Sequence, residues 1–124
     1  MLPNVSSFVD SQYSSDKYFG KIAVDAYIAK SEGECGDDMS FYLLIEDDII
    51  VQAKYYTEKG CGHTRAAGKI LAKMADKLDI YEALKITPMD ILAAEPKLEA
   101  SKHCSILAIT AFYNAISSYL LDQD

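Results

Sequence analysis

Three cysteines and the polar residues beside them are the side chains of this 124-residue sequence best suited to chemistry. Cys35, Cys61 and Cys104 each stand at a break in the hydrophobic pattern, and glycine flanks the first two. A cysteine that serves only packing more often lies among apolar neighbours. Loops carried on rigid elements are the usual platform for a binding site. We therefore interpret the three thiols as site residues.

Two further side chains extend the candidate ligand set. Asp37 follows Cys35 by two residues, and His103 directly precedes Cys104. Soft thiolates select iron-sulfur clusters, zinc or copper(I). Stable [2Fe-2S] proteins usually use four cysteines, so with three the fourth ligand is His103 or Asp37, and both stay open. A harder, protonatable fourth ligand predicts a cluster that is easily lost, which suits a protein that hands its cluster on.

The His103-Cys104 pair begins an apolar helical pattern that runs to about Leu121. The first turn of a helix has unpaired N–H groups and a partial positive charge, which favour an anion. We therefore expect Cys104 to lean towards the thiolate. The alternative is that His103 and Cys104 only cap and pack the helix. We interpret His63 as a helix-surface residue rather than a spare ligand. We interpret Lys102 as a solvated side chain rather than one that attracts an anionic persulfide.

Composition limits the class of protein. The formal net charge of −7 gives no basic face for nucleic acid. No apolar segment is expected to approach the roughly 20 residues that span a bilayer, and no secretory signal is evident, so we expect a cytoplasmic protein without a membrane partner. Three cysteines are an odd number without a close pair, which argues against a disulfide framework. Metal binding or thiol chemistry in a reducing compartment is the stronger interpretation.

The hydrophobic pattern predicts a sheet in the first half of the chain. Residues 1–16 are rich in serine and are expected to form a flexible arm, followed by one domain over 17–124. Alternating apolar residues then predict three strands, joined by turns at 31–38 and 46–48. Short connections indicate an antiparallel meander. The residues expected on the buried faces are Ile22, Val24, Ala26 and Ile28, then Met39, Phe41, Leu43 and Ile45, then Ile49, Val51, Ala53 and Tyr55.

The second half of the chain has helical periodicity. A helix is expected after Gly60-Cys61-Gly62, with a face formed by Ala67, Ile70, Leu71, Met74 and Leu78. A short helix follows at 80–85, and Thr87-Pro88 supplies an N-cap and a proline at the first helical position of the next, which Pro96 ends. The last helix is expected over 103–121. The fold class is α+β: a three-stranded antiparallel sheet with helices packed on it.

Three short motifs occur in order: Cys35-Gly36-Asp37, Gly60-Cys61-Gly62 and His103-Cys104-Ser105, with cysteine separations of 26 and 43 residues. In these motifs and spacings the chain resembles the iron-sulfur cluster assembly scaffolds of the IscU type, also found as the N-terminal domain of NifU. The resemblance covers essentially the whole chain from Ile22 on.

The resemblance implies a role for each site residue. Cys35, Cys61 and Cys104 are cluster ligands, with His103 or Asp37 as the fourth. Cys104 accepts persulfide sulfur from a cysteine desulfurase, and Asp37 governs cluster lability. The [2Fe-2S] cluster, built from iron and this sulfur, passes to apo-proteins or carriers, and zinc is a possible substitute in the site. Such a scaffold is not an enzyme in the usual sense. Because exposed thiolates on two chains can bridge iron, both a monomer and a cluster-bridged dimer stay open.

The sequence also departs from the family. The family's Leu-Pro-Pro-Val-Lys segment, read by an Hsp70-type chaperone, is replaced by Leu98-Glu99-Ala100-Ser101, which argues against chaperone-driven release. After Gly62 the family usually has small residues, whereas His63, Thr64 and Arg65 stand here.

The alternative function is a zinc-binding sulfur-transfer protein that relays persulfide. That branch carries an insertion between its second and third cysteines, for which this chain has no room.

Overall fold

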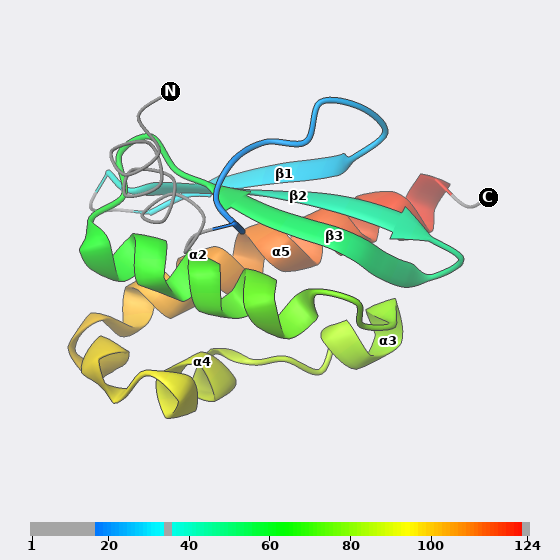
Figure 1. Cartoon of the computed structure of the whole chain (residues 1–124). Helices are drawn as coiled ribbons and strands as arrows, with labels where there is room; N and C mark the ends of the chain where they lie inside the picture. Colours follow the sequence, from blue (N-terminus) through cyan, green and yellow to red (C-terminus); the bar gives the residue numbers. More distant parts are fainter. Residues whose placement is uncertain (1–16, 34–35, 123–124) are drawn as a thin grey trace, which may run out of the picture.

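The computed structural model describes residues 17–33 and 36–122 (Figure 1). The expected N-terminal arm, residues 1–16, and Cys35 lie outside the described residues. The described chain forms a three-stranded sheet with helices packed against it, which confirms the predicted α+β class.

The sheet is an antiparallel meander in the order β1-β2-β3, formed by β1 (Tyr27–Glu32), β2 (Asp38–Glu46) and β3 (Ile49–Tyr56). The predicted inner face of β2 is confirmed, because Met39, Phe41, Leu43 and Ile45 are all buried. The predicted acidic turn is also confirmed. Asp47 and Asp48 both have positive φ, 53° and 65°, as a two-residue turn between antiparallel strands requires.

The predicted first strand was wrong in position. β1 begins at Tyr27, because Asp25 has a φ of 62° and interrupts the extended chain. Two residues expected to be buried are exposed: Val24, before the strand, by 67%, and Ile28, on the outer face of β1, by 51%. The opposite face of β1 packs on the last helix, where the Ser31 hydroxyl donates to the carbonyl of Leu107 at 2.9 Å.

The predicted inner face of β3 was correct for Ala53 and Tyr55 but wrong for Ile49 and Val51. Leu44 pairs with Gln52, whereas the next residue, Ile45, pairs with Ile50. One extra residue on β3 therefore forms a β-bulge. Because the bulge reverses the alternation of side chains, Ile50 is fully buried instead of its two neighbours.

Five helical segments follow the sheet: α2 (Gly62–Ala75), α3 (Ile80–Ala83), α4 (Pro88–Ala94), the 3-10 helix η1 (Pro96–Ser101) and α5 (Lys102–Asp122). Helices α2 and α5 lie side by side against one face of the sheet, and α4 packs beneath them on the side away from the strands (Figure 1). The predicted start of α4 is confirmed. The Asp90 carboxylate accepts the backbone N–H of Thr87 at 2.9 Å, and Pro88 is the first helical residue.

Helix α2 packs tightly against the sheet at Gly68. A Cβ added at Gly68 would lie 2.7 Å from the Tyr55 ring and 2.8 Å from the end of Met39, both closer than packed atoms approach. The absence of a side chain at Gly68 therefore lets the helix backbone approach β3 and β2. This approach fixes the start of α2, where Cys61 lies.

The expectation that no segment approaches the length and apolar character of a membrane span was wrong. The helical stretch Pro96–Asp122 is long and apolar enough to cross a bilayer by length and composition, with a mean hydropathy of 1.5 over an 18-residue window. In the structure, 56% of that window is buried inside the protein. Phe112 and Ile116 are fully buried, and the Phe112 ring packs edge-on to Phe41 at 5.5 Å. The apolar character of α5 is therefore explained by its place in the core.

Candidate metal site

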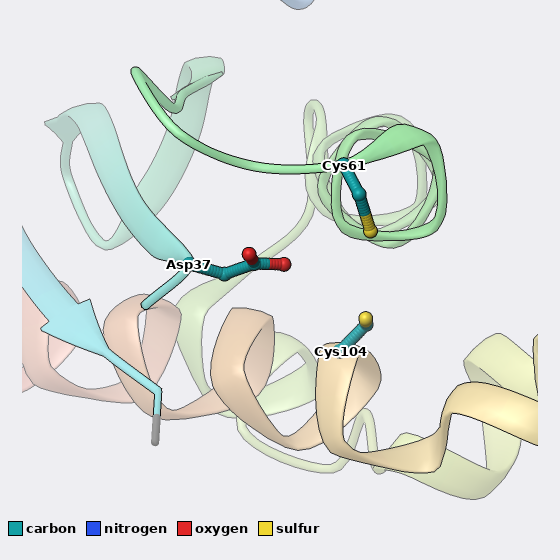
Figure 2. Close-up of side chains that lie close together, drawn as sticks. All are labelled: Asp37, Cys61 and Cys104. Carbon is teal, nitrogen blue, oxygen red and sulfur yellow. The ribbon is translucent and has the colours of Figure 1, made fainter. Parts of the chain in front are cut away.

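Three segments far apart in the sequence bring Asp37, Cys61 and Cys104 together (Figure 2). Asp37 lies directly before β2, Cys61 is the N-cap of α2, and Cys104 is in the first turn of α5. One carboxylate oxygen and the two sulfur atoms all lie within 4.8 Å of one another. Asp37 and Cys104 are buried, whereas Cys61 is exposed, so the group opens to solvent on the Cys61 side.

The turn before β2 positions Asp37. The Gly33 N–H donates to the Asp37 carbonyl at 2.8 Å, and the Gly36 N–H donates to the Gly33 carbonyl at 3.1 Å. Gly36 has a φ of 93°, a conformation that glycine adopts without strain. The glycine of the Cys35-Gly36-Asp37 motif is thus explained by the turn that carries the carboxylate.

Asp38 fixes the loop that carries Cys61. Its carboxylate accepts hydrogen bonds from the Thr57 hydroxyl at 2.9 Å and from the N–H groups of Glu58 and Lys59 at 3.1 and 2.8 Å. Burial raises the pKa of Asp38, but these donors outweigh burial and the pKa is lowered overall. The Gly60 N–H closes the loop on the Thr57 oxygen at 2.8 Å. The start of β2 and the loop before α2 are therefore held as one unit.

Thr64 lies between the three candidate ligands and was not identified from the sequence. Its side chain is fully buried, and its hydroxyl donates to the Asp37 carboxylate. The same oxygen lies 3.3 Å from the Cys104 sulfur and 3.6 Å from the Cys61 sulfur. The signal in the sequence was its spacing, since Thr64 precedes the buried Ala67 and Leu71 by three and seven residues and so shares their helix face.

The two thiols differ in acidity. The pKa of Cys61 is lowered, chiefly by the backbone N–H of Thr64 and next by its hydroxyl, because Cys61 stands at the free start of α2. The pKa of Cys104 is raised, chiefly by burial. The expectation that Cys104 leans towards the thiolate was therefore wrong. η1 runs directly into α5, so Cys104 is not at an open helix start. The pKa of Asp37 is lowered, chiefly by the Thr64 hydroxyl.

The other predicted site residues lie at the margin of this group. His103 is exposed and lines a groove with Ser31, Glu32, Gly33, Ile106, Leu107 and Thr110. His63 is a surface residue as expected, and its Nδ1 lies 2.6 Å from the Ser101 hydroxyl. Lys102 is exposed and forms an ion pair with Glu99 at 3.0 Å.

The donor set suits a thiophilic metal. Two sulfurs and one carboxylate oxygen within reach of one centre match the ligands that zinc and iron accept in proteins, and a fourth position remains for another ligand. The two glycines that flank Cys61 differ in the space around them. A Cβ at Gly60 would lie 2.8 Å from the Thr64 methyl group, whereas a Cβ at Gly62 would meet nothing within 4 Å. Fold and site define a small α+β domain with a cysteine and aspartate group that could hold a metal ion.

Comparison with known proteins identifies the family. The family described as NifU-like N terminal domain matches residues 9–124, and the chain belongs to that family. It is 38% identical over 85 residues to Iron sulfur cluster assembly protein 1 of Trachipleistophora hominis, covering 68% of this chain and 61% of the relative. It is 34% identical over 116 residues to the Iron-sulfur cluster assembly scaffold protein IscU 1 of Archaeoglobus fulgidus, covering 92% and 75%.

A third relative, the Iron-sulfur cluster assembly protein IscU of Plasmodium falciparum, is 34% identical over 88 residues, covering 71% of this chain and 54% of the relative. The chain thus spans less than two thirds of the length of two of these three relatives. Among solved structures, the NifU-like N-terminal protein of Brucella abortus is similar with a TM-score of 0.65 at 16% identity, covering 82% of this chain and 83% of that one. At this identity the likeness concerns the fold alone.

Proposed function

We propose that this protein is a scaffold on which a labile [2Fe-2S] cluster is assembled and from which it passes to apo-proteins or carriers. The observation that carries the proposal is the convergence of Asp37, Cys61 and Cys104 within 4.8 Å. It occurs in a family whose relatives bear the names of iron-sulfur cluster assembly proteins. In this role the iron and the cluster are cargo, and the protein acts as a carrier rather than an enzyme.

We assign the cluster ligands as Cys35, Cys61, Cys104 and Asp37. Asp37 is preferred to His103 because its carboxylate belongs to the converging group, whereas His103 is exposed along the neighbouring groove. Cys35 is included because it stands two residues before Asp37 in the sequence. The same ligands accept zinc, which is a substitute occupant of the site.

Cys104 is the proposed acceptor of sulfur from the persulfide of a cysteine desulfurase. Its thiolate attacks the terminal sulfur of that persulfide, and the desulfurase thiolate leaves. Cys104 is fully buried here and Cys61 is exposed, so the donor must approach from the Cys61 side. Mass spectrometry after incubation with a desulfurase and cysteine should find the sulfur adduct in the wild type and not in Cys104→Ser. An unchanged adduct in Cys104→Ser would move the role to another thiol.

The partners proposed are a cysteine desulfurase and the apo-proteins or carriers that receive the cluster, in a reducing cytoplasm. Release by an Hsp70-type chaperone is not proposed, because Leu98–Ser101 replaces the segment that such a chaperone reads. Nucleic acid is not expected as a partner of a chain with a net charge of −7. A monomer and a dimer that shares one cluster both remain compatible with a site that opens at Cys61.

The test is anaerobic reconstitution. Iron, zinc and acid-labile sulfide are measured before and after incubation with a cysteine desulfurase, cysteine and ferrous iron, and the visible spectrum is recorded. Equal iron and sulfide with a [2Fe-2S] spectrum are expected, and Cys61→Ser should lose most of the signal. Thr110→Val is the matched control, because this exposed hydroxyl on α5 bonds to the Ile106 carbonyl of its own helix. Tightly held zinc without any cluster would instead favour the persulfide-relay function.

Asp37→Ala should keep the assembled cluster for longer. The resemblance gives Asp37 control of lability, and a carboxylate can be protonated and released from iron more easily than a thiolate. The decay of visible absorption in the presence of a chelator measures this, with Glu46→Ala, an exposed residue at the end of β2, as the control. Faster decay in Asp37→Ala than in the wild type would contradict the assigned role.

A further inference from the structure

The Thr64 oxygen contacts all three candidate ligands. It donates to the Asp37 carboxylate and lies 3.3 Å from the Cys104 sulfur and 3.6 Å from the Cys61 sulfur. We call these three contacts the Thr64 network. A hydroxyl has one proton and two lone pairs, so it can serve a carboxylate as donor while it accepts from a thiol. One side chain thus links the three ligand atoms in the absence of metal.

The position of Thr64 is fixed by its surroundings. The side chain is fully buried in the first turn of α2. Its methyl group packs where a side chain at Gly60 would otherwise stand, at 2.8 Å from the ideal Cβ position. The methyl group therefore packs against the Gly60 loop, while the hydroxyl contacts the candidate ligands. Holding the ligands close is a consequence of this packing.

From this geometry we propose that Thr64 is a positioning residue that holds the metal-free site together and competes with a metal ion for the same ligands. This inference depends on the proposed function only in taking iron or a cluster as the bound cargo. A metal ion requires deprotonated thiols and the carboxylate oxygen, which are the groups that the Thr64 network engages. Loading the site therefore replaces these hydrogen bonds, and unloading restores them. Thr64 makes the site easier to empty.

Removing the hydroxyl should strengthen retention of metal. In Thr64→Val, which keeps the shape of the side chain, the metal-free site loses the donor to a buried carboxylate. In the wild type, metal binding takes the hydrogen-bond partners away from the buried Thr64 hydroxyl. Thr64→Val has no hydroxyl, so its loaded site does not carry this cost. Both effects favour the loaded state. A hydrogen bond to a charged group is large enough to change an equilibrium by roughly tenfold or more, so we expect Zn²⁺ to be bound about tenfold more tightly and to be released more slowly.

The experiment uses Zn²⁺ as the probe and the full chain as the protein. Wild type, Thr64→Val and Thr64→Ser are loaded with one equivalent of Zn²⁺, and its transfer to a chromophoric chelator is followed with time. Thr64→Ser keeps the hydroxyl and should release zinc at close to the wild-type rate. Thr110→Val, on the helix of Cys104, should also behave as the wild type. In parallel, the metal-free Thr64→Val should melt at a lower temperature than the metal-free wild type.

Release from Thr64→Val at the wild-type rate, or faster, would overturn the proposal, because Thr64 would then have no influence or would support the loaded state. If Thr64→Val does not fold without metal, Thr64→Ala is used with the same criterion. The zinc measurement requires neither a desulfurase nor sulfide. The role of Thr64 can therefore be tested even if the protein builds no cluster. Conversely, an unchanged release rate in Thr64→Val would not alter the result of the reconstitution.

Discussion

Cys61 and Cys104 face different surroundings although their sulfur atoms are neighbours. Cys61 is exposed at the start of α2, and the N–H and hydroxyl of Thr64 lower its pKa. Cys104 is fully buried, and burial raises its pKa. Because the thiolate is both the nucleophile and the metal ligand, a small electrophile in solution or a metal ion meets Cys61 first in the metal-free protein.

Alkylation of the metal-free protein should therefore modify Cys61 before Cys104. With iodoacetamide near pH 7, we expect the rate at Cys61 to exceed that at Cys104 by at least about tenfold, because both burial and protonation protect the second thiol. As pH rises, the rate at Cys61 should increase first, since its pKa is the lower of the two. Peptide mapping by mass spectrometry gives the two rates separately. Preferential modification of Cys104 would contradict the geometry of the site.

At the scale of elements, the site depends on how closely α2 approaches the sheet. Gly68 permits contact with Tyr55 and Met39, and Asp38 ties the loop before α2 to the start of β2. The close packing at Gly68 and the hydrogen bonds of Asp38 together place Cys61 opposite Asp37 and Cys104. The bulge in β3 turns Ile50 into the core between the sheet and the helices.

Gly68→Ala should weaken this packing. The added Cβ would lie 2.7 Å from the Tyr55 ring, so α2 or the ring must move, and overpacking of this kind costs about 1–3 kcal/mol in the free energy of unfolding. Gly62→Ala is the matched control on the same helix, because its Cβ would meet nothing within 4 Å. Urea unfolding measures both variants. A loss in Gly62→Ala as large as that in Gly68→Ala would show that packing against β3 is not the cause.

At the scale of the whole molecule, two buried carboxylates link stability to pH. Asp37 and Asp38 both have pKa values lowered from 3.8, so below about pH 5 the folded protein binds fewer protons than the unfolded chain. Their contribution to stability is present above the unfolded pKa and is lost as pH falls towards the folded pKa. The protein should therefore lose stability in acid.

Asp38→Asn tests this linkage. We expect the free energy of unfolding at pH 7 to fall by about 2 kcal/mol, because three hydrogen bonds lose a charged acceptor. The remaining decline between pH 5 and pH 3.5 should be shallower than in the wild type, since one of the two linked carboxyls is gone. Urea unfolding at several pH values measures both. A variant with the same slope as the wild type would show that Asp38 does not contribute to the acid response.

Local sequence patterns predicted most of the architecture. The alternation in Met39–Ile45, the acidic turn and the Thr87-Pro88 helix start are local signals, and the structure has all three. The three cysteine motifs and their spacing likewise indicated the family, which the match over residues 9–124 confirms. The predictions failed where a local pattern competed with packing, at the start of β1 and at the bulge in β3.

By itself, the sequence determined the α+β class, the family and which side chains are able to bind metal, because residue types, periodicity and spacing are local properties of the chain. Only the tertiary structure decided which of them meet, since Asp37, Cys61 and Cys104 come from three separate segments. It also reversed the expected acidity of Cys104 and placed the Thr64 hydroxyl among the ligands. Burial and contact between distant segments determine the acidity of Cys104 and the position of the Thr64 hydroxyl. Neither can be predicted from a local stretch of sequence.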